Sequence, residues 1–177
     1  MSTHTESVVA ATTQSRAGKY LTFFLASEEY GLEILKVSEI IGMQPITRVP
    51  RMPEFVRGVI NLRGKVIPIT DLRRKFSMAH DGSADSCIIV VQMRGLQTGI
   101  VVDRVSEVVA IAEADIEDAP SFGAGIHTEF LLGIGKAGGR VKLLLDIDKV
   151  LASSEVAALE VAALEVAALE VAQSHAA

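Results

Sequence analysis

Residues 50–76, PRMPEFVRGVINLRGKVIPITDLRRKF, constrain the fold more than any other part of the chain. Two β-type runs, 59–62 and 65–69, are separated only by Arg63 and Gly64. This spacing predicts a tight hairpin, in which Gly64 supplies the positive φ that a two-residue loop requires. Pro68 lies in the second run and cannot donate to a ladder, so we expect that strand at a sheet edge or at a bulge. Arg63 would then be presented at the hairpin tip.

The overlapping segment 48–75 is strongly basic. It contains eight Lys or Arg residues against two acidic ones, whereas the rest of the chain has nine basic and twenty acidic residues. The eight are Arg48, Arg51, Arg57, Arg63, Lys65, Arg73, Arg74 and Lys75. A basic segment on an acidic protein can steer a partner of opposite charge, and it can equally be an ordinary solvated face. Both interpretations stay open at this point.

Composition describes a globular chain of 177 residues, with 49% hydrophobic and 22% charged residues. The single cysteine, Cys87, excludes an internal disulfide and lies in the apolar run CIIVV, which predicts a buried, unreactive thiol. No signal-like segment follows Met1 and no apolar stretch is long enough to span a membrane, so we expect a cytoplasmic protein. A net charge of −5 and the absence of Trp argue against nonspecific nucleic-acid binding.

Short β-type runs separated by turn signals, with few helices, predict a mainly β protein of barrel or sandwich type. We read Ser27–Gly31 as a turn, expect a hairpin around Gly95, and allow a short helix before the second run of the stretch that ends in LEILKVSEII. The organisation that we predict is a mobile leader (1–17), a main domain (18–152) with a polar break near 81–86 between two subdomains, and a C-terminal tail (153–177).

Motifs of catalysis are few. Gly133, Gly135 and Gly138 spell G-x-G-x-x-G, but the alternating residues after them form a strand, whereas a dinucleotide site needs a helix there. The glycines therefore predict a hairpin turn. No serine-nucleophile motif occurs, and the histidines are too dispersed for a metal site: His4, His80, His127 and His175. The sequence predicts no enzyme, no cofactor and no bound metal.

Three segments in order, Glu28–Ile40, Pro53–Arg73 and Gly99–Val109, closely resemble the CheW-like domain family. The core of the match is NLRG-x-V-I-P-x-x-DLR, and the resemblance runs over roughly residues 20–151. It implies two SH3-like five-stranded β-barrel subdomains with a hydrophobic groove between them and a C-terminal helix. It also implies a non-enzymatic adaptor that couples transmembrane chemoreceptors to the histidine kinase CheA in membrane-apposed chemotaxis arrays. Its contact with the membrane would be indirect, through the receptors.

The resemblance also implies site residues. Those at the receptor-binding groove would be Val37, Glu39, Ile40 and Arg63. Those that face the kinase would be Ile34, Ile46, Thr47 and Phe122. A receptor tip is helical, so we expect an amphipathic helix to bind in an apolar groove. Arg63 and Glu39 would fix the register of that helix.

The tail departs from the family pattern. Residues 155–172 repeat EVAAL, a composition that favours a helix. Five residues advance by about 500° around a helix axis, so the glutamates and leucines spread over all faces and form no apolar stripe. We expect the family's C-terminal helix to begin near Asp146 or Ser153 and the repeat to continue it or to fray.

Two other classes of function remain as alternatives. One is a small enzyme on a β-barrel scaffold, which the absence of clustered acid, base or metal-ligating residues disfavours. The other is a nucleic-acid module on OB-like barrels that uses the basic segment 48–75, which would show steeply salt-dependent binding.

Overall fold

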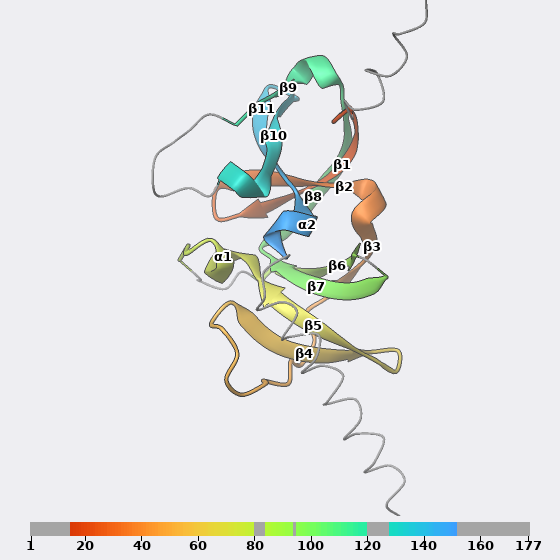
Figure 1. The fold of residues 1–177 in the computed structure, drawn as a ribbon, viewed down its shortest axis with the longest axis vertical. Helices are drawn as coiled ribbons and strands as arrows, with labels where there is room; N and C mark the ends of the chain where they lie inside the picture. The colour runs from red at the N-terminus through yellow and green to blue at the C-terminus, as the bar shows by residue number, and fades with distance from the viewer. Residues whose placement is uncertain (1–14, 80–83, 94, 120–127, 152–177) are drawn as a thin grey trace, which may run out of the picture.

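A computed structural model describes residues 15–79, 84–93, 95–119 and 128–151, and these form two sheets stacked along the long axis of the molecule (Figure 1). In spatial order the larger sheet contains β8 (Arg104–Ile111), β1 (Gly18–Leu25), β2 (Glu28–Glu33), β11 (Arg140–Leu145), β10 (Leu131–Ala137) and β9 (Ile116–Glu117). The smaller sheet contains β3 (Val37–Gly42), β6 (Cys87–Met93), β7 (Leu96–Val102), β5 (Lys65–Asp71) and β4 (Val56–Leu62).

The helical elements of the described residues are all short. They are the 3-10 turns η2 (Ile34–Lys36), η3 (Glu113–Asp115) and η4 (Thr128–Phe130), and the α-helices α1 (Leu72–Lys75) and α2 (Ile147–Val150). The predicted mainly β fold with two β subdomains is confirmed, although the sheets have six and five strands. Strands on both sides of residues 81–86 share the smaller sheet, so the two sheets are interleaved along the chain.

Three hydrophobic clusters hold the described residues together. One lies inside the smaller sheet and a small one lies inside the larger sheet. The largest combines residues of both sheets, such as Phe23 and Ile89, with Leu72 of α1 and with Ile147 and Val150 of α2; we call it the shared core. Figure 1 shows α2 between the two sheets, which agrees with its place in this cluster. The sheets are therefore parts of one packed unit.

The hairpin predicted around Arg63 and Gly64 is present. β4 and β5 pair antiparallel in register up to Leu62 and Lys65. Both loop residues have positive φ, 51° at Arg63 and 87° at Gly64, as a type I′ turn requires. The Gly64 N–H also donates to the Asn61 side-chain oxygen at 2.8 Å. The sequence predicted the role of Gly64, whereas the strained backbone of Arg63 was not anticipated.

The predicted place of Pro68 at a sheet edge is wrong. β5 lies between β4 and β7, and β4 is the outer strand. The parallel ladder of β5 with β7 begins only at Ile69, so Pro68 precedes the residues that pair on that side. The irregularity of the hairpin is in β4, between Val56 and Gly58, and not at Pro68.

The turn predicted at Ser27–Gly31 is also wrong, because β2 already begins at Glu28 and the turn is Ala26–Ser27. The hairpin around Gly95 is confirmed by the antiparallel pairing of β6 with β7. The glycine motif forms β10 and its turn to β11, and no helix follows it directly.

The two ends of the chain are described only in part. Asp146 is the N-cap of α2, which fits the first of the two predicted helix starts. Within the predicted leader, Arg16 forms ion pairs with Glu113 and Asp118, while residues 1–14 lie outside the described part. The EVAAL repeat also lies outside it. The leader, the domain boundaries and the tail stay predictions.

The base of the β4–β5 hairpin is fixed by close backbone contact. Thr47 and Val59 exchange two backbone hydrogen bonds, at 2.8 and 2.9 Å, which tie the segment after β3 to the outer strand β4. A Cβ atom on Gly58 would lie 2.0 Å from the Thr47 carbonyl oxygen, and its φ is +135°. Only glycine therefore allows this contact without movement of the backbone.

The C-terminal end of the hairpin is tied to the larger sheet. Asp71, almost fully buried, caps α1 by accepting from the Arg73 and Arg74 N–H groups. The Arg73 guanidinium forms an ion pair with Asp103. Asp103 also accepts a hydrogen bond from the Ala26 N–H at 2.6 Å, in the β1–β2 turn. The DLR and VVDRV motifs therefore meet at the junction of the two sheets.

Candidate partner-binding site

The structure brings Arg63 and Glu39 together. Arg63 lies after β4 and Glu39 on β3, the two outer strands of the smaller sheet, and their side chains form an ion pair. The Arg63 side chain is 70% exposed and that of Glu39 26% exposed. Two of the predicted receptor-binding residues are thus adjacent, and the guanidinium keeps most of its surface in solvent.

The other two predicted receptor-binding residues lie on β3 in different environments. Exposure alternates along β3, with Val37, Glu39 and Ile41 half-buried and Ile40 exposed. Val37 packs against the shared core, whereas Ile40 is 45% exposed. The register of β3 with β6 shifts between Val37 and Glu39. Ile40 is therefore the apolar member of the set that is available to a partner.

The predicted kinase-facing residues are spread over two segments. Ile34 is in η2 and packs against the shared core. Ile46 packs against the core of the smaller sheet, and Thr47 uses its backbone for the bridge to Val59 while its side chain is exposed. Phe122 lies outside the described residues. Nothing in the structure tests the kinase-facing role of these four residues.

Leu35 is a candidate contact that sequence reasoning missed. It follows Ile34 in η2 and is 94% exposed, more than any other large hydrophobic residue described. A single exposed leucine is common, but a bulky apolar side chain projecting from a one-turn helix between two strands can be reached by a partner. The sequence gives no signal for this exposure, because it depends on how η2 packs against its neighbours.

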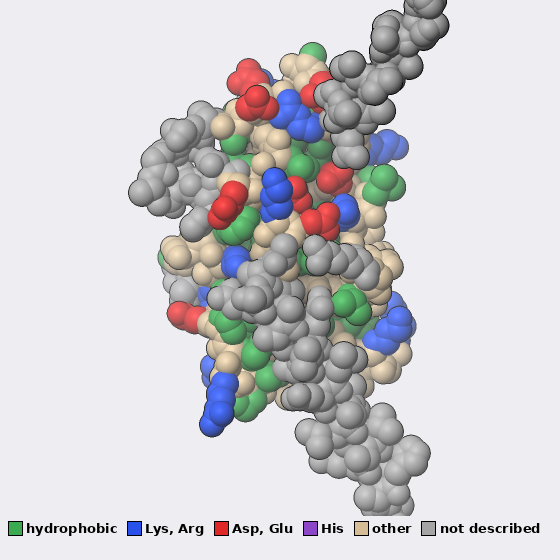
Figure 2. Space-filling view, in the orientation of Figure 1, with side chains coloured by type: hydrophobic (Ala, Val, Ile, Leu, Met, Phe, Trp, Pro, Cys, Tyr) green, Lys and Arg blue, Asp and Glu red, His purple; other side chains and the backbone are tan. Residues whose placement is uncertain are grey.

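Four of the eight basic residues in the segment 48–75 form ion pairs within the protein. Arg57 and Arg74 pair with Asp71, Arg63 with Glu39, and Arg73 with Asp103. The Lys75 ammonium lies 4.2 Å from the centre of the Phe55 ring. Among the described residues, Arg48, Arg51 and Lys65 have no ion-pair partner. These ion pairs use three carboxylates, those of Asp71, Glu39 and Asp103, so the segment keeps a net positive charge. Figure 2 shows acidic and basic side chains interspersed mainly over the upper half of the visible face, where the larger sheet lies.

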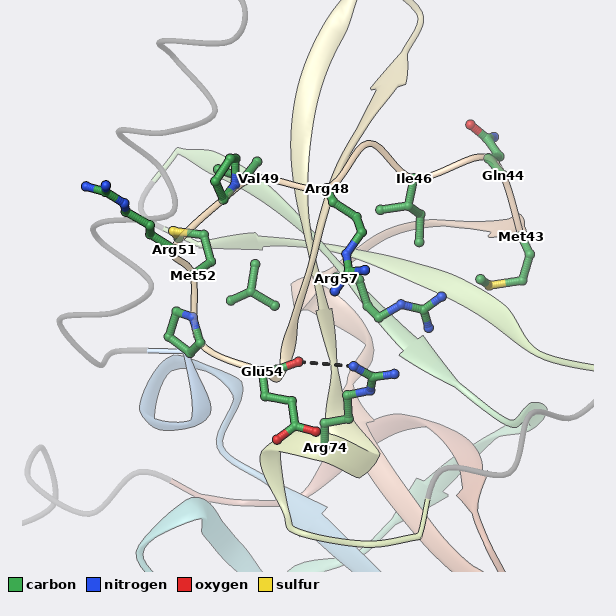
Figure 3. Close-up of a pocket in the computed structure, with 13 residues that line it drawn as sticks. Met43, Gln44, Ile46, Arg48, Val49, Arg51, Met52, Glu54, Arg57 and Arg74 are labelled. Carbon is green, nitrogen blue, oxygen red and sulfur yellow. Dashed lines mark hydrogen bonds between the residues drawn. The ribbon is translucent and has the colours of Figure 1, made fainter.

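The surface of the described residues includes two depressions. One, of about 610 Å³, is lined by the segment between β3 and β4 and by Arg74 of α1 (Figure 3). The other, of similar volume, is lined by residues of the larger sheet that include Glu29 and Leu143. Glu29 forms a 3.1 Å ion pair with Lys142, and both side chains are almost fully buried.

No cluster of three His, Cys, Asp or Glu residues that could hold a metal ion occurs in the part of the chain that the structure describes. Within those same residues, no helix is long and apolar enough to cross a membrane. Cys87 is half-buried rather than fully buried, and its burial raises the pKa of the thiol. A raised pKa lowers the thiolate fraction at neutral pH, which fits the predicted unreactive thiol.

The fold is a two-sheet β domain in which Arg63, Ile40 and Leu35 are exposed and can be reached by another molecule. Comparison with known proteins identifies the family. Residues 19–155 match the CheW-like domain. The chain is 43% identical to the chemotaxis protein CheW of Klebsiella aerogenes over 78% of this chain and 84% of that protein. It is 32% identical to the chemotaxis protein CheW of Treponema pallidum, over 77% and 83%.

A solved structure agrees with these matches. The scaffolding protein TtCheW from Thermoanaerobacter tengcongensis superposes with a TM-score of 0.72 at 38% identity, covering 78% of this chain and 95% of that one. The chain belongs to the CheW-like domain family. The resemblance in its three sequence segments is thereby confirmed.

Proposed function

We propose that this protein is a non-enzymatic adaptor that couples the cytoplasmic tips of chemoreceptors to the histidine kinase CheA in chemotaxis signalling arrays. The curated relatives are chemotaxis proteins and the solved relative is named a scaffolding protein, which supports this class. The observation that carries the proposal is Arg63, a largely exposed cation fixed at the tip of a tight hairpin and adjacent to Glu39. The protein would act in the cytoplasm, at the membrane only through the receptors.

Receptor binding would use Arg63 and Ile40 as the exposed contacts. An amphipathic receptor helix would place an apolar side chain against Ile40 and a carboxylate against the Arg63 guanidinium. Val37, which packs against the shared core, would hold β3 in position. The Arg63–Glu39 pair would orient the guanidinium before the receptor arrives.

Kinase binding would use a separate surface. We place it on η2 and on the segment after β3, where Ile34, Ile46 and Thr47 lie. Leu35, almost fully exposed, would supply the apolar contact in η2 that the half-buried Ile34 cannot. Phe122 would make a second contact that the assembled array requires, so Phe122→Ser would spare receptor binding and impair assembly with the kinase. Normal arrays with that variant would contradict its role.

The test measures coupling directly. Receptor-bearing membranes are mixed with the kinase and the adaptor, and co-sedimentation and kinase autophosphorylation are measured. We expect Arg63→Ala to abolish receptor coupling while the protein stays folded, because removal of one partner of an interfacial charge pair costs about 2–5 kcal/mol of binding free energy. Lys65→Ala is the matched control, since Lys65 is an exposed cation two residues away.

Unchanged receptor binding by folded Arg63→Ala would contradict the proposed receptor site. Loss of coupling in Lys65→Ala as well would show a general effect of charge on the hairpin rather than a specific contact.

A further inference from the structure

The depression between β3 and β4 is unusually rich in arginine. Arg48, Arg51, Arg57 and Arg74 all line it, and Glu54 is the one carboxylate among its lining residues. Figure 3 shows Arg48 and Arg57 close together in its middle, while Arg74 approaches from α1. The Arg74 guanidinium donates to the Glu54 backbone carbonyl at 3.4 Å.

The arginines are only partly neutralised. Arg57 and Arg74 share one carboxylate, that of Asp71, with N–O distances of 3.4 and 3.7 Å. Arg48 and Arg51 are exposed and have no ion-pair partner among the described residues. After Asp71 and Glu54 are taken into account, two positive charges remain uncompensated at this site. A ligand with carboxylates would be attracted to it.

The lining is also partly apolar. Its other residues are mostly aliphatic or sulfur-containing: Met43, Ile46, Val49, Pro50, Met52, Pro53 and Val56. Met43 is 41% exposed although it is a large hydrophobic residue. A segment that alternates carboxylates with small aliphatic side chains would satisfy both the arginines and this apolar lining.

The chain itself contains such a segment. Residues 155–172 repeat Glu, Val, Ala, Ala and Leu, with glutamates at 155, 160, 165 and 170. Residues 152–177 contain no Lys, Arg or Asp, so they account for four of the five net negative charges of the protein. The rest of the chain therefore has a net charge of only −1, and the negative charge of the protein is concentrated in this segment.

We propose that the glutamate repeat, residues 155–172, binds in the arginine depression of the same molecule. Leu151, the last described residue, is buried in the shared core together with Leu72 of α1, the helix that carries Arg74. The 26 residues that follow would span about 39 Å even if they were entirely helical, which reaches across a domain of this size. Covalent attachment gives a high effective concentration, so a weak contact suffices.

Occupation of the depression would also cover Ile46, one of the proposed kinase contacts, because Ile46 lines it. The repeat would then compete with the kinase for this surface. This consequence alone rests on the proposed function, and the binding of the repeat can be tested without kinase or receptor.

The experiment is paramagnetic relaxation measured by NMR on the full chain. A nitroxide is attached at Ala162→Cys, between two of the glutamates, in a Cys87→Ala background. We expect amide signals of the non-proline residues within 43–57 to fall below half of their diamagnetic intensity, and signals near Val141, in the other depression, to remain unchanged. Because exposed charges are screened by salt, about 0.5 M NaCl should restore most of the lost intensity.

Two variants test the chemistry of the contact. Arg48→Gln with Arg51→Gln should restore the signals, whereas Lys65→Gln with Arg140→Gln, two exposed cations outside the depression, should not. Unbroadened signals in the labelled full chain would overturn the proposal, as would broadening that the Arg48 and Arg51 changes leave intact. Broadening that appears only when isotope-labelled and spin-labelled molecules are mixed would also overturn it, since the repeat would then bind a second copy.

Discussion

The two ends of the β4–β5 hairpin differ in how firmly the structure holds them. At the base, Gly58 contacts the Thr47 backbone, Asp71 caps α1, and Arg73 pairs with Asp103 with side chains only 14% and 13% exposed. At the tip, Arg63 pairs with Glu39 but keeps 70% of its side chain in solvent. Arg63 and Arg73 belong to one continuous motif, NLRGKVIPITDLR. Arg73 links the two sheets through Asp103, whereas Arg63 is exposed to solvent.

The contrast shows that one motif carries two structural roles. A binding residue needs a rigid support, and the residues that provide the support lie on the same hairpin as the residue that is presented. Substitutions at the base, at the adjoining helix and at the tip separate these two roles through their effects on the free energy of unfolding of the protein.

The largest effect is expected from Asp103→Ala. It leaves the Arg73 guanidinium without its carboxylate in a mostly buried place and removes the acceptor of the Ala26 N–H. Breaking such a pair costs about 3–5 kcal/mol. Urea unfolding followed by circular dichroism measures it. Asp103→Asn, which keeps an oxygen acceptor, should lose less, and Asp115→Ala on the exposed η3 should change little. A loss below about 1 kcal/mol in Asp103→Ala would show that the junction does not depend on this pair.

The next effect is expected from Gly58→Ala. The new Cβ would lie 2.0 Å from the Thr47 carbonyl oxygen, and the backbone has a φ of +135°. Strain of this kind costs about 1–3 kcal/mol before any movement of the bridge is counted. Gly42→Ala on β3 is the matched control, because nothing lies within 4 Å of its added Cβ. Equal stability of the two variants would mean that the base of the hairpin is not closed by this contact.

The sequence predicted the hairpin because a two-residue loop with glycine has few alternatives, and it predicted the family through its motifs. It did not predict the ion pairs at the base, because Asp103 and Arg73 are thirty positions apart and their pairing depends on how the sheets stack. Pro68 was predicted at a sheet edge because proline has no N–H to donate to a neighbouring strand. In the structure the ladder of β5 with β7 starts at Ile69, one residue after Pro68, so no N–H of Pro68 is needed on that side. The exposure of Leu35 depends on how η2 packs and carries no sequence signal of its own.

A gain in stability is expected from Ser77→Gly, beside the base. Ser77 follows α1 with a φ of +56°, and the N–H groups of Ser77 and Met78 bond back to the carbonyls of Arg74 and Arg73 at 3.1 and 2.7 Å. This is a Schellman ending in which glycine is preferred. Relief of the left-handed strain, less the entropy of glycine in the unfolded chain, should stabilise the protein by about 0.5–1 kcal/mol. Ser77→Ala keeps the strain and should be neutral. A stabilising Ser77→Ala would show that the backbone is not the cause.

The smallest effect on stability is expected at the tip. A double-mutant cycle of Arg63→Ala and Glu39→Ala should give a coupling of about 0.2–1 kcal/mol, as for exposed ion pairs, and salt should reduce it. Alanine at position 63 keeps a Cβ at the same positive φ, so the turn itself is not relieved. The Lys136–Glu117 pair, with side chains 56% and 62% exposed, is a matched surface pair and should give a similar value. A coupling above about 2 kcal/mol would mean that the Arg63–Glu39 pair behaves as a buried ion pair and not as an exposed one. A weak coupling means that Arg63 can leave Glu39 for the carboxylate of a partner at little cost, which a presented residue on a rigid hairpin needs.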